Sequence, residues 1–279
     1  MKKISVLFCV LVFLCMCGVA FADRILITQY DNGELGAYTY MESNLESFGH
    51  TADIVDARTG GAIASALAAE EYDQVFLFDL TSAAYITPSD LTALSAFFGD
   101  HNSLVVDARS YGYYYQPNQA SEVALLGNIA EAFSDRGGGI WVGTDHDPMW
   151  TRNGNPFLEA INVNPVTGSH SEAVNDYDPA SILLDGVVAT ELWAAGQSVG
   201  TAPLGIQPNG IDMRFHFGHS SPQYGAIPYI TASFGEYIAP DEDPDIHDGD
   251  ASVPEPATML LFGSGLIGLG IFGRKKLFK

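Results

Sequence analysis

Residues 74–79 read Gln-Val-Phe-Leu-Phe-Asp, a short run that is apolar at every interior position. Such a run predicts a strand buried on both faces, as in a parallel sheet that is covered by helices. Similar runs lie on both sides of it in the chain, at residues 24–28, 51–55, 103–107 and 139–143. The sequence therefore predicts five strands of one mostly parallel sheet.

Segments with helical spacing of apolar residues separate these strands. They lie at residues 35–48, 61–69, 88–98 and 122–133. The regular alternation of strands and helices predicts an α/β fold, in which a doubly wound sheet carries helices on both faces.

The pattern changes at about residue 182. Short strand-like runs at residues 183–206, 213–217 and 227–234 lie among loops rich in Gly and Pro. This pattern predicts a β-rich C-terminal extension of the α/β domain. Its strands could either extend the edge of the parallel sheet or close over the carboxyl ends of its strands.

The first 22 residues have the three parts of a secretory signal peptide. Two lysines give a positive start, residues 4–19 are almost wholly apolar, and an A-x-A site follows. We expect signal peptidase to cut between Ala22 and Asp23 after export by the Sec machinery. An uncleaved amino-terminal anchor and a lipoprotein signal at Cys17 are the alternatives.

Composition excludes several classes of function. All three cysteines lie inside the signal, so the exported body has no disulfide, no thiolate nucleophile and no cysteine ligand for a metal. The chain has 34 acidic and 12 basic residues, and the basic residues between positions 23 and 253 are six arginines. Such a surface excludes nucleic acid as a partner and repels anionic lipid. It suits solubility outside the cell, and it could also hold divalent cations loosely.

The end of the chain carries four features in a fixed order. They are an acidic linker at residues 239–253, the triplet Pro254-Glu255-Pro256, an apolar run at residues 257–273 and the basic cluster Arg274-Lys275-Lys276. The apolar run predicts a transmembrane helix, and the basic cluster places the body on the periplasmic side of the inner membrane. The predicted domains are therefore a signal peptide (1–22), an α/β domain (23–238), the linker (239–253) and a tail with a membrane helix (254–279).

This tail resembles a PEP-CTERM sorting signal in its Pro-Glu-Pro triplet, its Gly-rich apolar run and its terminal basic cluster. The resemblance implies processing by an exosortase-type membrane enzyme and release to the cell surface or the extracellular matrix. It also implies a Gram-negative host that makes exopolysaccharide or biofilm, so exopolysaccharide is an expected partner. A hydrophobic tail of this kind holds its protein at the membrane until it is cut away. A permanent single-span anchor is the alternative.

The body is similar to the class I glutamine amidotransferase-like fold, a flavodoxin-like variant. The likeness rests on residues 24–27, 72–78, 137–146 and 154–161. Active members of that family place a cysteine on a sharp turn between a strand and a helix, with histidine and glutamate nearby. The body lacks the cysteine, so the resemblance implies the scaffold without the amidotransferase chemistry.

Ligands of doubly wound sheets bind at the carboxyl ends of the strands, and two polar clusters fall there, at residues 145–147 and 107–112. Asp145, His146 and Asp147 directly follow the strand at residues 139–143. Two carboxylates beside an imidazole could bind a divalent metal or carry out acid–base catalysis. Aspartates that follow a turn also often accept hydrogen bonds from backbone amides and do no more.

Ser110 is a second candidate, as a catalytic nucleophile. It lies in an A-x-S-x-G sequence, which approximates the G-x-S-x-G elbow with alanine in place of the first glycine. Asp107 and Arg109 beside it could simply pair with each other. The tyrosines at residues 113–115 could line a carbohydrate groove or lie as a lid over the core.

His216 and His219 are candidate metal ligands, as are Asp145 and Asp147. Two histidines three residues apart can share a metal only if the segment bends, because on a strand they point to opposite faces. No cofactor is predicted other than a divalent metal that these side chains could hold.

These observations support two hypotheses about function. In the first, the body is a non-catalytic domain that binds a glycan or another matrix component, or gives the matrix bulk. In the second, it is a degenerate or metal-dependent hydrolase that uses residues 145–147. An enzyme needs those side chains to converge with His216, His219 or Ser110 on one pocket, whereas a binding or structural protein holds each in local contacts.

Overall fold

The computed structural model describes residues 22–29, 35–78, 85–100, 102–109, 120–177, 179, 181–192 and 198–234. All of them belong to the first of two compact units of the chain, residues 1–237. Most of the predicted signal peptide, Ser110, the three tyrosines that follow it, the acidic linker and the whole sorting tail lie outside the described residues. Among the helices that are described, none is long and apolar enough to span a bilayer.

Five parallel strands form the predicted sheet. They are β1 (Arg24–Gln29), β2 (Thr51–Asp56), β3 (Gln74–Leu77), β4 (Ser103–Asp107) and β5 (Ile140–Gly143). Their order in the sheet is β2-β1-β3-β4-β5, and every neighbouring pair is parallel. The prediction of a large, mostly parallel sheet is confirmed.

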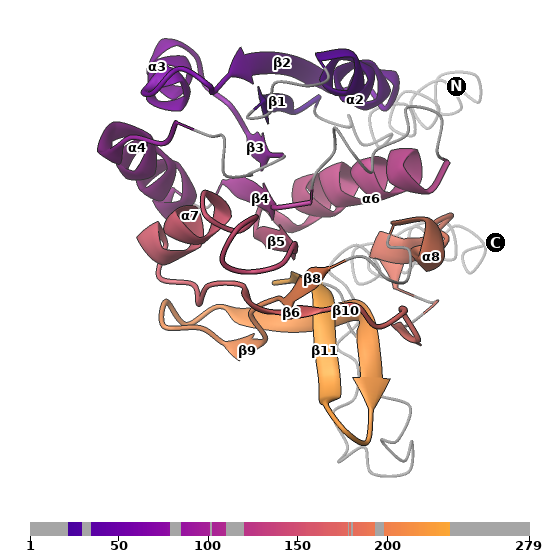
Figure 1. The fold of residues 1–279 in the computed structure, drawn as a ribbon. Helices are drawn as coiled ribbons and strands as arrows, with labels where there is room; N and C mark the ends of the chain where they lie inside the picture. Colours follow the sequence, from indigo (N-terminus) through magenta and orange to yellow (C-terminus); the bar gives the residue numbers. More distant parts are fainter. Residues whose placement is uncertain are drawn as a thin grey trace, which may run out of the picture. The chain divides into compact units, whose positions relative to one another are not determined.

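Helices cover both faces of this sheet (Figure 1). Helices α2 (Leu35–Ser47) and α6 (Ala120–Arg136) pack on one face. Helices α3 (Ala62–Ala69), α4 (Pro88–Gly99) and α7 (Gly154–Ala160) pack on the other. The sequence predicted the first four of these segments, but it did not predict α7.

The alternation of side chains along β1 shows how one strand serves both faces. Ile25 and Ile27 pack with the residues of α2 and α6, whereas Leu26 packs with those of α3, α4 and α7. All three side chains are at most 1 % exposed. Successive residues of a strand point to opposite faces, so a continuously apolar strand has to lie between two layers of helices.

Asp90 fixes the starts of two helices at once. Its carboxylate accepts hydrogen bonds from the backbone and hydroxyl of Thr87, which completes a capping box at the start of α4. The same carboxylate accepts from the amides of Gly61 and Ala64, at 2.9 and 3.0 Å, at the start of α3. One buried side chain therefore ties α3 to α4 on the same face of the sheet.

The C-terminal extension lengthens the sheet beyond β5. The strands are β7 (Asp176–Tyr177), β9 (Gly205–Ile206), β10 (Asp212–Ser221) and β11 (Gly225–Ala232), all antiparallel to their neighbours. β11 pairs with β5, and β10 pairs with β11, β7 and β9. Strands β6 (Thr167–His170) and β8 (Val199–Thr201) form a separate two-stranded sheet. Of the two arrangements left open by the sequence, the structure has the extended edge.

Part of the extension differs from the prediction. Residues 183–192 were expected to be strand, but the chain forms a 3₁₀ helix, η1 (Ile182–Leu184), and a short helix, α8 (Ala189–Leu192). Leu183 and Leu192 are buried in the same cluster as the inner face of α6. Two short helical turns allow these leucines to turn toward α6, while Ile182 and Val188 stay 48 % and 51 % exposed.

Candidate functional site

The carboxyl ends of β4 and β5 lie side by side, at the edge of the sheet where the sequence predicted a site. Asp107, the last residue of β4, pairs in register with Gly143, the last residue of β5. The chain then continues into Arg109 on one strand and into Asp145 and His146 on the other. Parallel strands bring such residues together because all their carboxyl ends meet at one edge.

Arg109 is the centre of a buried ion cluster. Its Nη2 lies 2.8 Å from Oδ2 of Asp107, and its Nη1 lies 2.9 Å from Oε1 of Glu122 in the first turn of α6. The Arg109 side chain is 6 % exposed, and those of Asp107 and Glu122 are 0 % and 5 % exposed. The predicted pairing of Asp107 with Arg109 is confirmed, and Glu122 completes it.

The surroundings of this cluster shape its electrostatics. Burial raises the pKa of Glu122, while the Arg109 guanidinium acts in the opposite direction. The guanidinium also lies 5.8 Å from the ring centroid of Trp141 on β5. A Cβ at Gly143 would lie 2.7 Å from Oδ1 of Asp107, so only glycine leaves room there for the carboxylate.

The sequence analysis missed the role of Glu122, although the sequence contains a signal for it. Leu125, Leu126 and Ile129 follow Glu122 at spacings of three, four and seven, and all are buried. A carboxylate on the apolar stripe of a helix is costly unless it is paired. That placement indicates a cationic partner, which the fold supplies as Arg109.

Asp145 and His146 form the second polar pair of this edge. Nδ1 of His146 lies 2.7 Å from Oδ1 of Asp145, and the backbone amide of His146 donates to the same oxygen at 2.6 Å. Asp145 is 3 % exposed, and burial raises its pKa to about 6, although the hydrogen bonds from His146 oppose the shift. A carboxyl group with a pKa of about 6 could take up or release a proton near neutral pH.

Asp147 has a different environment from Asp145. Its carboxylate accepts from the hydroxyl of Thr151 at 2.7 Å and from Nδ2 of Asn155 at 3.4 Å. Its backbone amide donates to the carbonyl of Gly168 at 2.9 Å. These contacts hold the turn that leads into α7, so Asp147 has a structural role, but its carboxylate is bound by side chains and not by the backbone amides that the sequence alternative named.

The two candidate histidines of β10 are held by backbone carbonyls. His216 is 0 % exposed, and its Nε2 lies 2.8 Å from the carbonyl oxygen of Phe234. Because a carbonyl only accepts, Nε2 donates, and Nδ1 is left to accept from the hydroxyl of Ser181 at 3.2 Å. Nδ1 of His219 likewise lies 2.8 Å from the carbonyl oxygen of Ala173.

The described residues do not form a metal site. Within those ranges, no three side chains of His, Cys, Asp or Glu come together in a way that could hold a metal ion. Asp145 and Asp147 are two residues apart in the chain but bind different partners, and His216 has both ring nitrogens engaged. The arrangement supports proton exchange at one pair and local structure elsewhere.

Comparison with known proteins identifies the tail of the chain. The family model described as the PEP-CTERM protein-sorting motif matches residues 252–276, which confirms the predicted sorting motif. The motif implies an exported protein that is anchored in the membrane and then processed by an exosortase-type membrane enzyme. No curated protein and no solved structure gives a significant match. The likeness of the body to glutamine amidotransferases finds no match and stays a prediction.

Proposed function

We propose that this protein is a component of the cell envelope or extracellular matrix whose body binds a neutral polysaccharide, or bulks the matrix, without catalysis. The sorting motif supports the location, because it marks exported proteins that an exosortase-type membrane enzyme processes. The formal charge of −22 at pH 7 supports a neutral ligand, since an acidic surface repels acidic polymers.

The observation that carries the proposal is the local pairing of the candidate catalytic side chains. Asp147 is held by Thr151, and His216 lies between a hydroxyl and a backbone carbonyl. The guanidinium of Arg109 is shared by two carboxylates. An active site presents its catalytic groups to a common cavity, where they can reach a substrate. Side chains held in this way stabilise the fold instead.

The scaffold we propose is a flavodoxin-like sheet. The strand order β2-β1-β3-β4-β5 is the order typical of flavodoxin-like proteins, and this supports the predicted likeness of the body to the amidotransferase-like variant. Because one such scaffold hosts many functions, the strand order supports the architecture and not an activity.

Two exposed tyrosines near the β10–β11 hairpin are the surface we propose for the glycan. Tyr177 lies opposite Phe217 at the edge of the sheet, and Tyr224 lies in the turn between β10 and β11. They are 46 % and 50 % exposed. A tyrosine offers a flat apolar ring and a hydroxyl donor together, which suits the face and rim of a sugar.

The test is binding of the exported protein to neutral polysaccharides, measured by isothermal titration calorimetry. We expect Tyr177→Ala and Tyr224→Ala each to weaken binding about tenfold, the effect of losing one aromatic contact. Tyr85→Ala is the matched control, because Tyr85 is 61 % exposed but precedes α4 on another part of the fold. Equal losses in all three variants would contradict the proposed surface.

One observation favours a hydrolase as the second candidate function. The buried Asp145 and the imidazole of His146 form a pair that could act as a general base near neutral pH. The test is a screen of glycoside and ester substrates, with metal content measured by mass spectrometry on the wild type and on Asp145→Ala and Asp147→Ala. Turnover that is lost in Asp145→Ala, or a stoichiometric metal that both variants lose, would favour the enzyme over the binding domain.

A further inference from the structure

The predicted signal peptidase site directly adjoins the first strand of the sheet. Cleavage is expected between Ala22 and Asp23, and β1 begins at the next residue, Arg24. β1 lies between β2 and β3, so it is an interior strand that is paired along both edges. No spacer separates the cleavage site from the sheet.

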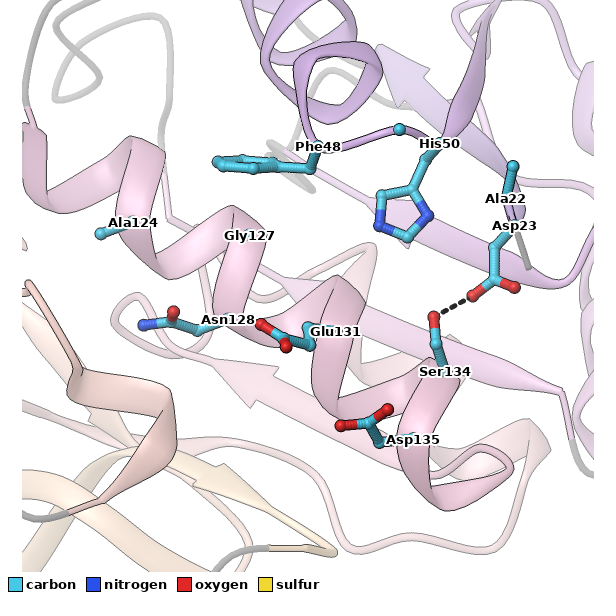
Figure 2. Close-up of a pocket in the computed structure, with 11 residues that line it drawn as sticks. Ala22, Asp23, Phe48, His50, Ala124, Gly127, Asn128, Glu131, Ser134 and Asp135 are labelled. Carbon is cyan, nitrogen blue, oxygen red and sulfur yellow. Dashed lines mark hydrogen bonds between the residues drawn. The ribbon is translucent and has the colours of Figure 1, made fainter. Parts of the chain in front are cut away.

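Asp23 is anchored through both its backbone and its side chain. Its carbonyl oxygen accepts from the amide of Thr51 at 2.9 Å, at the start of β2. Its Oδ2 accepts from Nε2 of Gln74 at 2.6 Å and from the hydroxyl of Ser134 near the end of α6. Figure 2 shows the bond from Ser134 to this carboxylate. One residue thereby joins β2, β3 and α6.

Arg24 is fixed as firmly as Asp23. Its amide donates to Oδ2 of Asp73 at 2.8 Å, and its carbonyl oxygen accepts from the amide of Asp73 at 2.9 Å. Its guanidinium lies 2.7 Å from carboxylate oxygens of both Asp53 and Glu70. The two residues that follow the scissile bond are therefore both bound to the folded sheet, although they are only partly buried.

Ala22, the residue before the scissile bond, is exposed to solvent, unlike the partly buried residues that follow it. It lines a pocket of about 660 Å³ together with Asp23. Figure 2 shows this pocket between the end of α2 and the helix α6, with Phe48 and Gly127 on its rim. Ala22 thus lies exposed at an open pocket, whereas the residues from Arg24 onward enter the sheet.

We infer that the signal peptide is removed efficiently only before the body folds, because folding draws Asp23 and Arg24, on the carboxyl-terminal side of the cleaved bond, into the sheet. A peptidase holds its substrate as an extended strand on both sides of the bond that it cuts, and folded chains are cut through transiently opened states. Opening here requires Asp23 and Arg24 to leave β2, β3 and α6 together. A chain that folds with its signal attached therefore loses the signal slowly, and it stays in the membrane until then.

The size of the protection follows from the hydrogen bonds that must break. The backbone and side-chain bonds of Asp23 and the backbone bonds of Arg24 each favour the closed state, typically by a few-fold. Taken together they predict that the folded precursor is cut at least about thirtyfold more slowly than the unfolded one.

The experiment uses the full precursor in detergent with purified signal peptidase. Precursor folded beforehand is compared with the same precursor added from urea at the moment of mixing, and mass spectrometry reads the new amino terminus. The control is a variant with six Gly and Ser residues inserted between Ala22 and Asp23, which moves the bond away from the sheet and keeps the A-x-A site. We expect this variant to be cut at the same rate whether it is folded or unfolded.

Two results would overturn the inference. One is a folded wild type that is cut as fast as the folded spacer variant, because the sheet would then offer no protection. The other is an unfolded wild type that is cut at a bond other than Ala22–Asp23. The readout is cleavage alone, so either result leaves the proposed polysaccharide binding to be decided by its own assay.

Discussion

Replacing Arg109 by methionine removes the guanidinium that the carboxylates of Asp107 and Glu122 share, while most of the side-chain volume stays in place. We expect Arg109→Met to lower the free energy of unfolding at pH 7 by about 4 kcal/mol. A domain of this kind is typically stable by roughly 5–15 kcal/mol, so the variant should remain folded only under mild conditions.

The magnitude follows from the burial of the cluster. Asp107 and Glu122 are 0 % and 5 % exposed, so neither carboxylate can turn to water when its partner is removed. Removing one partner of a buried pair typically costs about 3–5 kcal/mol. Burial already raises the pKa of Glu122, and the loss of Arg109 raises it further. Glu122 therefore takes up a proton more readily in the variant, and the loss of unfolding free energy should be smaller at pH 5 than at pH 7.

The assay is urea unfolding at pH 7 and pH 5, followed by tryptophan fluorescence, which Trp141 beneath the guanidinium reports. Arg58→Met is the matched control, because Arg58 pairs with Asp56 at the surface, where the two side chains are 36 % and 50 % exposed. Arg58→Met should lower the free energy of unfolding by less than about 1 kcal/mol. An Arg109→Met variant that loses no more than this control, or the same amount at both pH values, refutes the reasoning.

Three further predictions concern other parts of the fold. Because the pKa of Asp145 is about 6, against roughly 4 in an unfolded chain, its contribution to stability is full below pH 4 and is lost as the pH rises through 6. Asp145→Asn should remove this dependence, about 2 kcal/mol between pH 4 and pH 7 in urea unfolding. Gly218→Ala should lower the free energy of unfolding by about 2–3 kcal/mol, because the added Cβ would lie 2.1 Å from the carbonyl oxygen of Ile227. The control is Gly99→Ala, whose Cβ meets open space and should leave the free energy of unfolding unchanged. Asp90→Ala should cost about 2 kcal/mol at pH 7 by thermal unfolding, because it leaves amides of α3 and α4 without their acceptor.

For each of these three predictions, one result would contradict the reasoning. An unchanged pH dependence in Asp145→Asn would mean that the carboxylate is not the titrating group. Equal stabilities of the two alanine variants would mean that the hairpin relaxes around the new methyl group. Burial alone would raise the pKa of Asp90, but the hydrogen bonds from Thr87 and from the amides of Ala64 and Gly61 lower it. Wild type and Asp90→Ala should therefore converge as the pH falls below 4, and a constant difference would contradict this account.

The sheet could be predicted because its signal is local. Strands β3, β4 and β5 are buried at every position, and four-residue to five-residue apolar runs report that directly. The segment at residues 182–192 could not be predicted in the same way. Helical turns of three or four residues gain little from their own propensity, and here they form because Leu183 and Leu192 pack against α6.

In the candidate site, too, contacts between neighbours in the chain could be predicted, whereas contacts between distant residues could not. Asp145 and His146 are neighbours in the chain, so their contact could be predicted from the sequence. His216 is different, because its partners Ser181 and Phe234 lie 35 and 18 residues away. Its spacing to His219 suggested a pair of metal ligands, but only the folded chain shows which partners already bind its two ring nitrogens.

The placement of Asp23 has a chemical consequence. The lysines of this chain are at positions 2, 3, 275, 276 and 279, inside the predicted signal and the sorting tail. Removal of both segments would leave the α-amino group of Asp23 as the single primary amine of the protein, at the pocket shown in Figure 2. Amine-reactive esters would then attach one label at a known place, and reducing sugars of a surrounding matrix would find no lysine to glycate.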